Sequence, residues 1–289
     1  MKKSILLIAL IVLLLILGCN SKSKKTTSTE QELPQNPIIQ KIAELKASGY
    51  EIVDYHAHLK GGLTMEELLK HSKKTGIDYG VAFNAGVGFP ITNDSTLLAN
   101  YNQYKDYPVL MAMQAEGREW VNMFSKENIS TFDYVFTDAM TWTDTKGRRM
   151  RLWMPEEVFV DDKDDFMDQL VGKIVGVIEN EPIDLYVNAT FLPDILQAEY
   201  DALWTKDRMD KVINASVTNN IAIEINARYK IPSATFIKRA KAAGVKFSMG
   251  TNNTGKELGT LDYAIEMIDE CGLEPADFFK PVKKEVQRK

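Results

Sequence analysis

Seven short runs of β-branched and aromatic residues alternate with longer segments of helical apolar spacing, and this alternation restricts the possible folds most strongly. Such alternation is typical of βα units, which build a parallel sheet. The predicted strands are residues 51–56, 79–83, 108–115, 132–137, 183–188, 221–225 and 245–250. The predicted helices are residues 64–75, 95–105, 117–126, 163–179, 206–218, 233–243 and 256–271. Seven units within about 220 residues favour a closed or nearly closed α/β barrel of TIM-like type over a doubly wound sheet.

Other sequence features exclude several classes of protein. The turn after the first predicted strand, Lys60-Gly61-Gly62-Leu63, has neither the dinucleotide-binding nor the P-loop spacing. Hydrophobic residues make up 45% and charged residues 26% of the chain, as in an ordinary globular protein. The formal net charge is −5, and no basic stripe with interleaved aromatics occurs, so we expect no nucleic-acid partner. The long connection 139–162 is rich in charged and aromatic residues, and such connections are often functional.

The N-terminal residues 1–18 have the pattern of an export signal. Met1-Lys2-Lys3 is a short positive segment, and Ile5 to Leu17 is almost purely aliphatic. The following Gly18-Cys19 resembles the bacterial lipobox, which implies cleavage before Cys19 and lipidation of its thiol. An uncleaved N-terminal anchor is the alternative. Both place the protein in the bacterial cell envelope, outside the cytoplasm and attached to a membrane.

The rest of the chain is predicted to be a tether followed by one domain. Residues 19–36 are rich in Ser, Thr, Lys and Gln without apolar periodicity, which is typical of a flexible tether. Residues 37–289 are predicted to form a single barrel domain. With Cys19 lipidated, Cys271 has no partner for a disulfide, and we expect it to pack as a small apolar residue near a helix end.

Polar residues follow every predicted strand at the point where its apolar run ends. In a parallel barrel the active site lies at the carboxyl ends of the strands, and strands buried on both faces are otherwise apolar. These residues are therefore expected to converge on one rim. In chain order they are Asp54, His56, His58, Asn84, Gln114, Glu116, Asp138, Asn188, Glu224, Asn226, Asn252 and Asn253.

The His56-Ala57-His58 pair is the strongest indication of a metal site. Residues i and i+2 of a strand point to the same face, so both imidazoles can reach one ion, and neutral imidazole suits Zn, Mn or Fe. Glu116 is the predicted carboxylate ligand. Asp138 and Glu224 are the predicted catalytic carboxylates, able to take a proton from metal-bound water. Each of the three could instead pair with a nearby arginine.

The predicted substrate-binding residues surround this pair. Lys60 and Arg118 supply positive charge, as does the run 148–151, and guanidinium groups bind phosphate or carboxylate in a bidentate manner. A solvated charged loop is the alternative for these residues. The amides predicted to hydrogen-bond a substrate are Asn84, Asn188, Asn226 and Asn252. Trp120, Trp142 and Trp153 either wall the pocket or anchor the packing. The third histidine, His71, is expected on a solvated helix face.

Two motifs resemble the PHP (polymerase and histidinol phosphatase) superfamily. Asp54-Tyr55-His56-Ala57-His58 resembles its opening His-x-His motif. Glu224-Ile225-Asn226 and the later segment 244–251 resemble its last two units. The resemblance covers about residues 50–255 and implies a distorted seven-stranded βα barrel that binds up to three metal ions and hydrolyses phosphoesters. Residues 113–120 and 188–193 resemble an uncharacterised PHP-like branch of exported bacterial proteins.

The chain also departs from the PHP pattern. Asn84 stands where a strand ends in Asp-His, Asn188 replaces a later His-bearing motif, and Asn252-Asn253 replaces the closing Asp-x-His. Most histidines of a trinuclear site are thus missing. Only His56, His58, Glu116 and Glu224 carry over as ligands, which favours one divalent metal ion over three.

The sequence supports three functional hypotheses. The leading one is a metal-dependent hydrolase of PHP type that acts outside the cytoplasm on a phosphoester or other anionic small molecule. The second is a catalytically degenerate barrel that binds a small polar ligand. The third is a structural envelope lipoprotein. The expected partners are a small-molecule substrate and, through the N-terminal lipid, a membrane, while the oligomeric state stays open.

Overall fold

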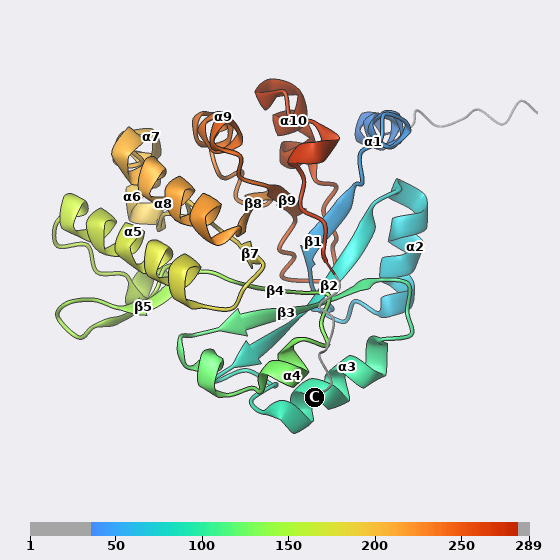
Figure 1. Ribbon diagram of the computed structural model, residues 1–289, viewed down its shortest axis with the longest axis horizontal. Helices are drawn as coiled ribbons and strands as arrows, with labels where there is room; N and C mark the ends of the chain where they lie inside the picture. The colour runs from blue at the N-terminus through green and yellow to red at the C-terminus, as the bar shows by residue number, and fades with distance from the viewer. Residues whose placement is uncertain (1–35, 283–289) are drawn as a thin grey trace, which may run out of the picture. The chain divides into compact units, whose positions relative to one another are not determined.

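The computed structural model describes residues 36–282, whose centre is a closed barrel of seven parallel strands (Figure 1). The barrel order follows the chain, and β9 closes onto β1 through the pair Asp54 and Met249. The strands are β1 (Val53–Ala57), β2 (Asp78–Gly86), β3 (Leu110–Glu116), β4 (Tyr134–Thr137), β7 (Leu185–Tyr186), β8 (Ala222–Asn226) and β9 (Phe247–Gly250). The predicted seven-stranded α/β barrel is confirmed.

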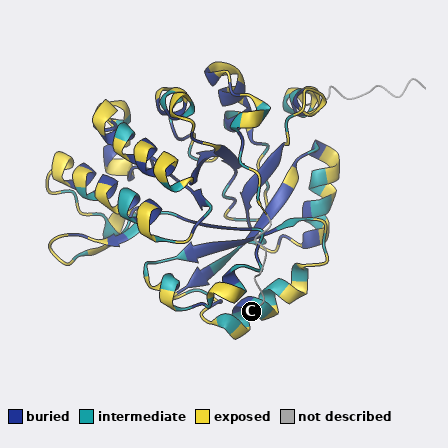
Figure 2. Ribbon diagram, in the orientation of Figure 1, coloured by how far each residue is buried: buried dark blue, intermediate teal, exposed yellow. Residues whose placement is uncertain are grey.

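Helices surround the barrel, with their inner faces buried and their outer faces exposed (Figure 2). No helix within residues 36–282 combines the length and hydrophobicity required to cross a membrane. The helices are α1 (Pro37–Ala47), α2 (Met65–Thr75), α3 (Asp94–Tyr104), α4 (Lys126–Ile129), α5 (Lys163–Asn180), α6 (Asp194–Gln197), α7 (Tyr200–Leu203), α8 (Lys206–Asn219), α9 (Ala234–Ala243) and α10 (Asp262–Cys271).

Local capping residues explain where several helices begin and end. Thr64 accepts a hydrogen bond from the Glu67 amide at 3.2 Å, while the Glu67 carboxylate accepts from the Thr64 amide at 3.1 Å, which starts α2 with a capping box. Gly76 ends the same helix with a φ of 78°, in the left-handed region that glycine adopts without steric cost. Both ends agree with the helix predicted for residues 64–75.

The barrel interior is filled by aromatic and aliphatic side chains. Alternate residues of the strands point inward and form a cluster separate from the core between strands and helices. Tyr134 lies in this cluster, and its hydroxyl donates to the Tyr55 carbonyl at 2.7 Å. The cluster comprises Val53, Tyr55, Ala82, Ala112, Tyr134, Phe136, Leu185, Val187 and Ala222. Because this part of the barrel is packed, inward-facing polar residues collect at the carboxyl ends of the strands.

The predicted helix 117–126 is wrong. Gly117 has a φ of 74°, which breaks the chain direction, and only a 3-10 turn follows at Glu119–Asn122. Ser125 then caps the separate short helix α4. Similarly, the predicted helix 256–271 begins only at Asp262, because Leu261 has a φ of 62°.

Several elements were missed in the sequence, among them the one-turn helices α6 and α7. Helix α1 precedes the barrel, capped by Asn36, whose side chain accepts from the Ile38 amide. The long connection 139–162 contains an antiparallel hairpin of β5 (Thr141–Thr143) and β6 (Arg149–Arg151). These strands are three residues each, too short for an apolar alternation to be recognised.

Substitution of Gly80 tests the packing inside the barrel. An added Cβ would lie 1.8 Å from the Tyr134 hydroxyl oxygen, so we expect Gly80→Ala to lower the free energy of unfolding. Overpacking of this kind costs about 1–3 kcal/mol, measurable by urea denaturation. The matched control is Gly172→Ala in α5, where nothing lies within 4 Å of the added Cβ. At position 172, alanine should raise the free energy of unfolding by about 0.5–1 kcal/mol. An equal loss of unfolding free energy in both variants would contradict the close contact between Gly80 and Tyr134.

Candidate active site

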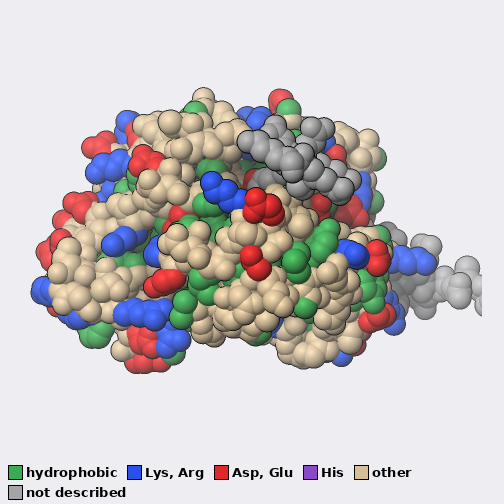
Figure 3. Space-filling model, turned by 60° about the horizontal axis from the view of Figure 1, so that its bottom comes forward, with side chains coloured by type: hydrophobic (Ala, Val, Ile, Leu, Met, Phe, Trp, Pro, Cys, Tyr) green, Lys and Arg blue, Asp and Glu red, His purple; other side chains and the backbone are tan. Residues whose placement is uncertain are grey.

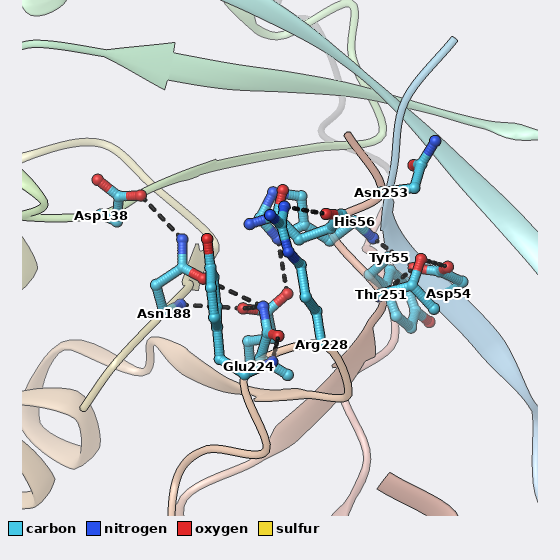
Figure 4. Close-up of polar contacts among 12 residues, drawn as sticks. Asp54, Tyr55, His56, Asp138, Asn188, Glu224, Arg228, Thr251 and Asn253 are labelled. Atoms are coloured by element: carbon cyan, nitrogen blue, oxygen red, sulfur yellow. Dashed lines mark hydrogen bonds and ion pairs between the residues drawn. The ribbon is translucent and has the colours of Figure 1, made fainter. Parts of the chain in front are cut away.

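The carboxyl end of the barrel carries a continuous network of buried polar side chains (Figure 4). The His56 Nδ1 atom lies 2.6 Å from Glu224 Oε1, and each side chain is 1% exposed. The other Glu224 oxygen accepts from the Asn188 amide at 2.9 Å and from Asn226 Nδ2 at 3.0 Å. Glu224 thus has both oxygens occupied inside the protein, and it fixes the orientation of the His56 ring.

The charge state of Glu224 determines the tautomer of His56. Burial by itself would raise the pKa of the Glu224 carboxyl, but His56 and the hydrogen-bond donors outweigh it and hold that pKa below its usual value. An ionised carboxylate can only accept, so Nδ1 of His56 is the donor. The lone pair of His56 then lies on Nε2.

His58 reaches the same tautomer through a different partner. Its Nδ1 donates to the Ala82 carbonyl at 3.0 Å, which leaves the lone pair on Nε2. Burial, followed by the nearby His56 and Lys60, lowers the pKa of His58 well below its usual value, so the ring is neutral. The Asn253 side chain accepts from the His58 amide at 2.7 Å and donates to its carbonyl at 2.9 Å. The backbone of His58 is therefore fixed as well.

The two histidines fit a metal ion. Both Nε2 atoms are buried without a hydrogen-bond partner, and the ring centroids are 5.2 Å apart. Two imidazoles on one ion, at about 2.0–2.1 Å from metal to nitrogen, have centroids at a similar separation. Neutral imidazoles with the second nitrogen bound to a carboxylate or carbonyl are the usual ligands. However, no group of three or more His, Cys, Asp or Glu side chains within residues 36–282 is arranged to hold a metal.

Glu116, the predicted carboxylate ligand, lies at the end of β3. Its Oε1 accepts from Asn84 Nδ2 at 2.6 Å. Burial, followed by repulsion from Asp138, raises the pKa of Glu116 to about 7. A carboxyl group that exchanges its proton near neutral pH is suited to general acid–base chemistry.

The remaining amides and carboxylate of the predicted site contact one another. Asn188 Nδ2 donates to Asp138 Oδ2 at 2.9 Å, and Asn226 Nδ2 also lies 3.1 Å from Asn188 Oδ1. Asn188 has a φ of 53°, a left-handed conformation just after the two-residue strand β7. This conformation turns the backbone N–H of Asn188 toward Glu224. The backbone N–H of Asn252 donates to the His56 carbonyl at 2.9 Å. The structure therefore brings these predicted residues together.

Arg118 lies near this rim but is held by the protein. Its guanidinium donates to Glu181 at 2.7 Å and to the Thr137 hydroxyl and Asp138 carbonyl at 2.9 Å each. Trp120, which is fully buried, donates to the same Glu181. In the 148–151 run, Arg148 and Arg151 pair with nearby carboxylates. Arg118, Arg148 and Arg151 are thus paired within the protein, which neither the predicted substrate contact nor the alternative of a solvated charged loop had anticipated.

Arg228 takes the position expected for Arg118. It follows β8, donates to the Asn252 carbonyl at 3.2 Å, and lies over the Tyr229 ring at 5.0 Å. Its position four residues after Glu224, at a strand end, was the signal that could have identified it. Thr251, which donates to Asp54 from both its amide and its hydroxyl, was also missed.

Two adjoining cavities open at this end of the barrel. One, of about 460 Å³, is lined by Lys60, Asn84, Glu116, Arg228 and Asn252 among others. The second, of about 370 Å³, shares Lys60 and Asn84 and reaches His58. On the face drawn in Figure 3, basic and acidic side chains are interspersed among apolar and neutral ones.

Comparison with known proteins supports the fold. No family model and no curated protein sequence matches the chain. The structure is similar to histidinol phosphate phosphatase from Lactococcus lactis, solved with zinc, L-histidinol and phosphate. The TM-score is 0.58 at 14% sequence identity, covering 78% of this chain and 95% of the other. The chain has a TIM-like barrel of PHP type.

Two further matches are too distant to support an argument. An archaeal ribonuclease P complex with mature tRNA matches with a TM-score of 0.37 at 12% identity, covering 82% of this chain and 100% of the other. A phospho-2-dehydro-3-deoxyheptonate aldolase from Thermotoga maritima matches with a TM-score of 0.29 at 12% identity, covering 78% of this chain and 68% of the other. At these identities, and at that of the phosphatase, similarity shows the fold alone.

The raised pKa of Glu116 predicts a dependence of stability on pH. The folded protein keeps this proton up to about pH 7. The unfolded chain releases it near a pKa of about 4.3, so stability falls as pH rises through this window. Metal-free wild-type protein should therefore lose more thermal stability between pH 5 and pH 8 than Glu116→Gln. The exposed control Glu127→Gln should follow the wild type. Superimposable profiles for wild type and Glu116→Gln would contradict the assignment.

Proposed function

We propose that the chain is a metal-dependent hydrolase of PHP type that acts on an anionic small molecule, such as a phosphoester, outside the cytoplasm. The observation that supports it most is the pair of buried Nε2 atoms on His56 and His58, which lack hydrogen-bond partners. A buried polar atom without a partner costs free energy unless something binds it. Two imidazoles with unpartnered Nε2 atoms at the catalytic end of a barrel are suited to a divalent metal.

The surrounding residues have distinct roles in this proposal. His56 and His58 would hold the Zn, Mn or Fe ion, which when bound supplies Lewis acidity and lowers the pKa of a coordinated water. Glu224 accepts the hydrogen bond from His56 Nδ1 and thereby holds the proton on that nitrogen and orients the His56 ring. We assign proton transfer to Glu116 because it lines the cavity and its pKa is about 7.

The assignment of Glu116 and Glu224 differs from the prediction made from sequence. Glu224 was predicted to be catalytic, but its two oxygens already accept three hydrogen bonds. Glu116 was predicted to be a metal ligand, but its place in the cavity and its raised pKa favour a role in proton transfer. Asp138 interacts electrostatically with Glu116 and raises its pKa, so we propose that it tunes the proton donor.

A barrel that binds a small polar ligand without catalysis is the second candidate. It is favoured by the lack of a three-residue metal cluster among residues 36–282 and by the amides of the rim. Amide side chains hydrogen-bond well but provide neither charge nor a base. Turnover of a phosphoester that is lost in His56→Ala, with the fold retained, would exclude this candidate.

Metal binding tests the proposal directly. After loading with Mn or Zn and dialysis, wild-type protein should retain about one equivalent by elemental analysis. His56→Ala and His58→Ala should weaken binding at least as much as the about 10–100-fold loss typical of an outer-shell change. Less than about a tenth of an equivalent in the wild type, without affinity for added metal, would contradict the proposal.

The third histidine provides a matched control. His71, expected on a solvated helix face, is half-buried there, with Nδ1 2.7 Å from the Tyr79 hydroxyl. It lies on α2, away from the His56–His58 pair, and His71→Ala should retain wild-type metal binding. Equal losses in all three variants would indicate general destabilisation and not a specific site.

The export signal, the lipid on Cys19 and the tether 19–36 concern residues that lie almost entirely outside the described range, and we propose them from the sequence alone. In a bacterial host, wild-type protein should incorporate labelled palmitate and fractionate with membranes. Cys19→Ser should lose both properties. Cys271→Ser is the control, since Cys271 is buried at the end of α10, as predicted. Membrane fractionation without label would instead favour an uncleaved anchor.

A further inference from the structure

One tryptophan differs from the others in its surroundings. Trp120, Trp142 and Trp204 are 0%, 5% and 3% exposed, whereas Trp153 is 43% exposed. Trp153 follows β6 in the long connection 139–162 and lines the 460 Å³ cavity that also contains Glu116. A large apolar side chain exposed at the edge of a cavity is a common mark of a binding site.

The indole of Trp153 is available for stacking. On the same cavity wall, Phe191 and Tyr229 already pack edge to face with ring centroids 4.8 Å apart. Within residues 36–282, Trp153 has no aromatic or cationic partner. Aromatic faces attract flat or ring-shaped groups through dispersion and through their quadrupole.

The same cavity contains two cations that lack an ion-pair partner. Five arginines of the described chain pair with carboxylates: Arg118, Arg148, Arg151, Arg208 and Arg239. Among residues 36–282, neither Lys60 nor Arg228 has a carboxylate within ion-pair distance. Burial, together with Arg228, lowers the pKa of Lys60, while Glu116 opposes this. Two unpaired cations in one cavity are suited to an anionic ligand.

We propose that this cavity binds a small anionic molecule containing a ring, with the anionic group at Lys60 and Arg228 and the ring against Trp153. The inference rests on the proposed function and deepens it by naming the substrate class. The amides of Asn84, Gln114 and Gln197 line the cavity and can hydrogen-bond ring substituents. A volume of about 460 Å³ accommodates a molecule of the size of a sugar phosphate or a nucleoside monophosphate.

The adjoining cavity is a weaker candidate for the ring. Its aromatic residues Phe83 and Tyr104 stack on each other, with centroids 5.2 Å apart and planes at 20°. Each ring already covers one face of the other. Tyr104 therefore provides a matched aromatic control for Trp153.

The experiment uses metal-free protein and three phosphate probes: a hexose phosphate, a nucleoside monophosphate and ring-free glycerol phosphate. Calorimetric titration should show at least one ring-containing probe binding about tenfold or more tightly than glycerol phosphate, since only the ring probes can stack on Trp153. The two ring probes distinguish a sugar from a base as the preferred ring. Acrylamide quenching of the exposed Trp153 should fall when that probe binds.

Three variants assign the contacts. Trp153→Ala should lower the affinity for the preferred ring probe about tenfold, to that of glycerol phosphate. The affinity for glycerol phosphate itself should not change. Arg228→Gln should weaken all three probes alike. Tyr104→Ala should bind like the wild type. The proposal is overturned by equal affinity for all three probes, by no binding of any probe, by an unaffected Trp153→Ala variant, or by an equal loss in Tyr104→Ala.

The proposed function can fail separately. Metal-free protein should retain ring-probe binding, because the absence of the metal does not change the cavity wall at Trp153. Ring-probe binding without metal affinity or turnover would remove the hydrolase proposal and leave this inference intact. The opposite result is metal-dependent turnover of glycerol phosphate at the same rate as the ring probes, with the rates unchanged in Trp153→Ala. It would support the hydrolase proposal and remove the inference that a ring binds at Trp153.

Discussion

The hydrogen bond between His56 and Glu224 joins the ends of β1 and β8 past the intervening strand β9, and the rest of the site depends on it. It is possible because β9 ends in Gly250 between them. A Cβ on Gly250 would lie 2.1 Å from Glu224 Oε1 and 2.7 Å from His56 Cβ. Glu224 also accepts from Asn188 and Asn226, and Asn188 donates to Asp138. One buried carboxylate thus links the ends of β1, β4, β7 and β8.

Buried charges of this kind are costly unless fully hydrogen-bonded, and a satisfied network is rigid. The site therefore has two parts with different physical properties. The His56–Glu224 network is satisfied except at the two imidazole Nε2 atoms. The cavity beside it has Lys60 and Arg228 without carboxylate partners among residues 36–282 and a tryptophan exposed at its edge. The first part is suited to hold an ion, and the second to accept a molecule.

The sequence predicted which residues meet at this end of the barrel because strand alternation and the i, i+2 rule depend only on local spacing. It did not predict how their side chains pair. Glu224 is 168 residues from His56, and only the closed barrel shows that it orients this ring. Arg118 was predicted at the rim from its position after β3, but Glu181 and Thr137 hold it. Gly117, whose left-handed conformation no apolar pattern reveals, broke the predicted helix.

The asparagines at the strand ends, Asn84 and Asn188, have a physical role in this structure. Asn84 donates to Glu116, and Asn188 donates to Asp138, so each amide stabilises a carboxylate that a metal ion could otherwise neutralise. A neutral amide offsets less charge than a divalent ion does, and burial together with Asp138 then raises the pKa of Glu116 to about 7. In the function proposed above, the metal is therefore left to the His56–His58 pair, and the anion to Lys60 and Arg228.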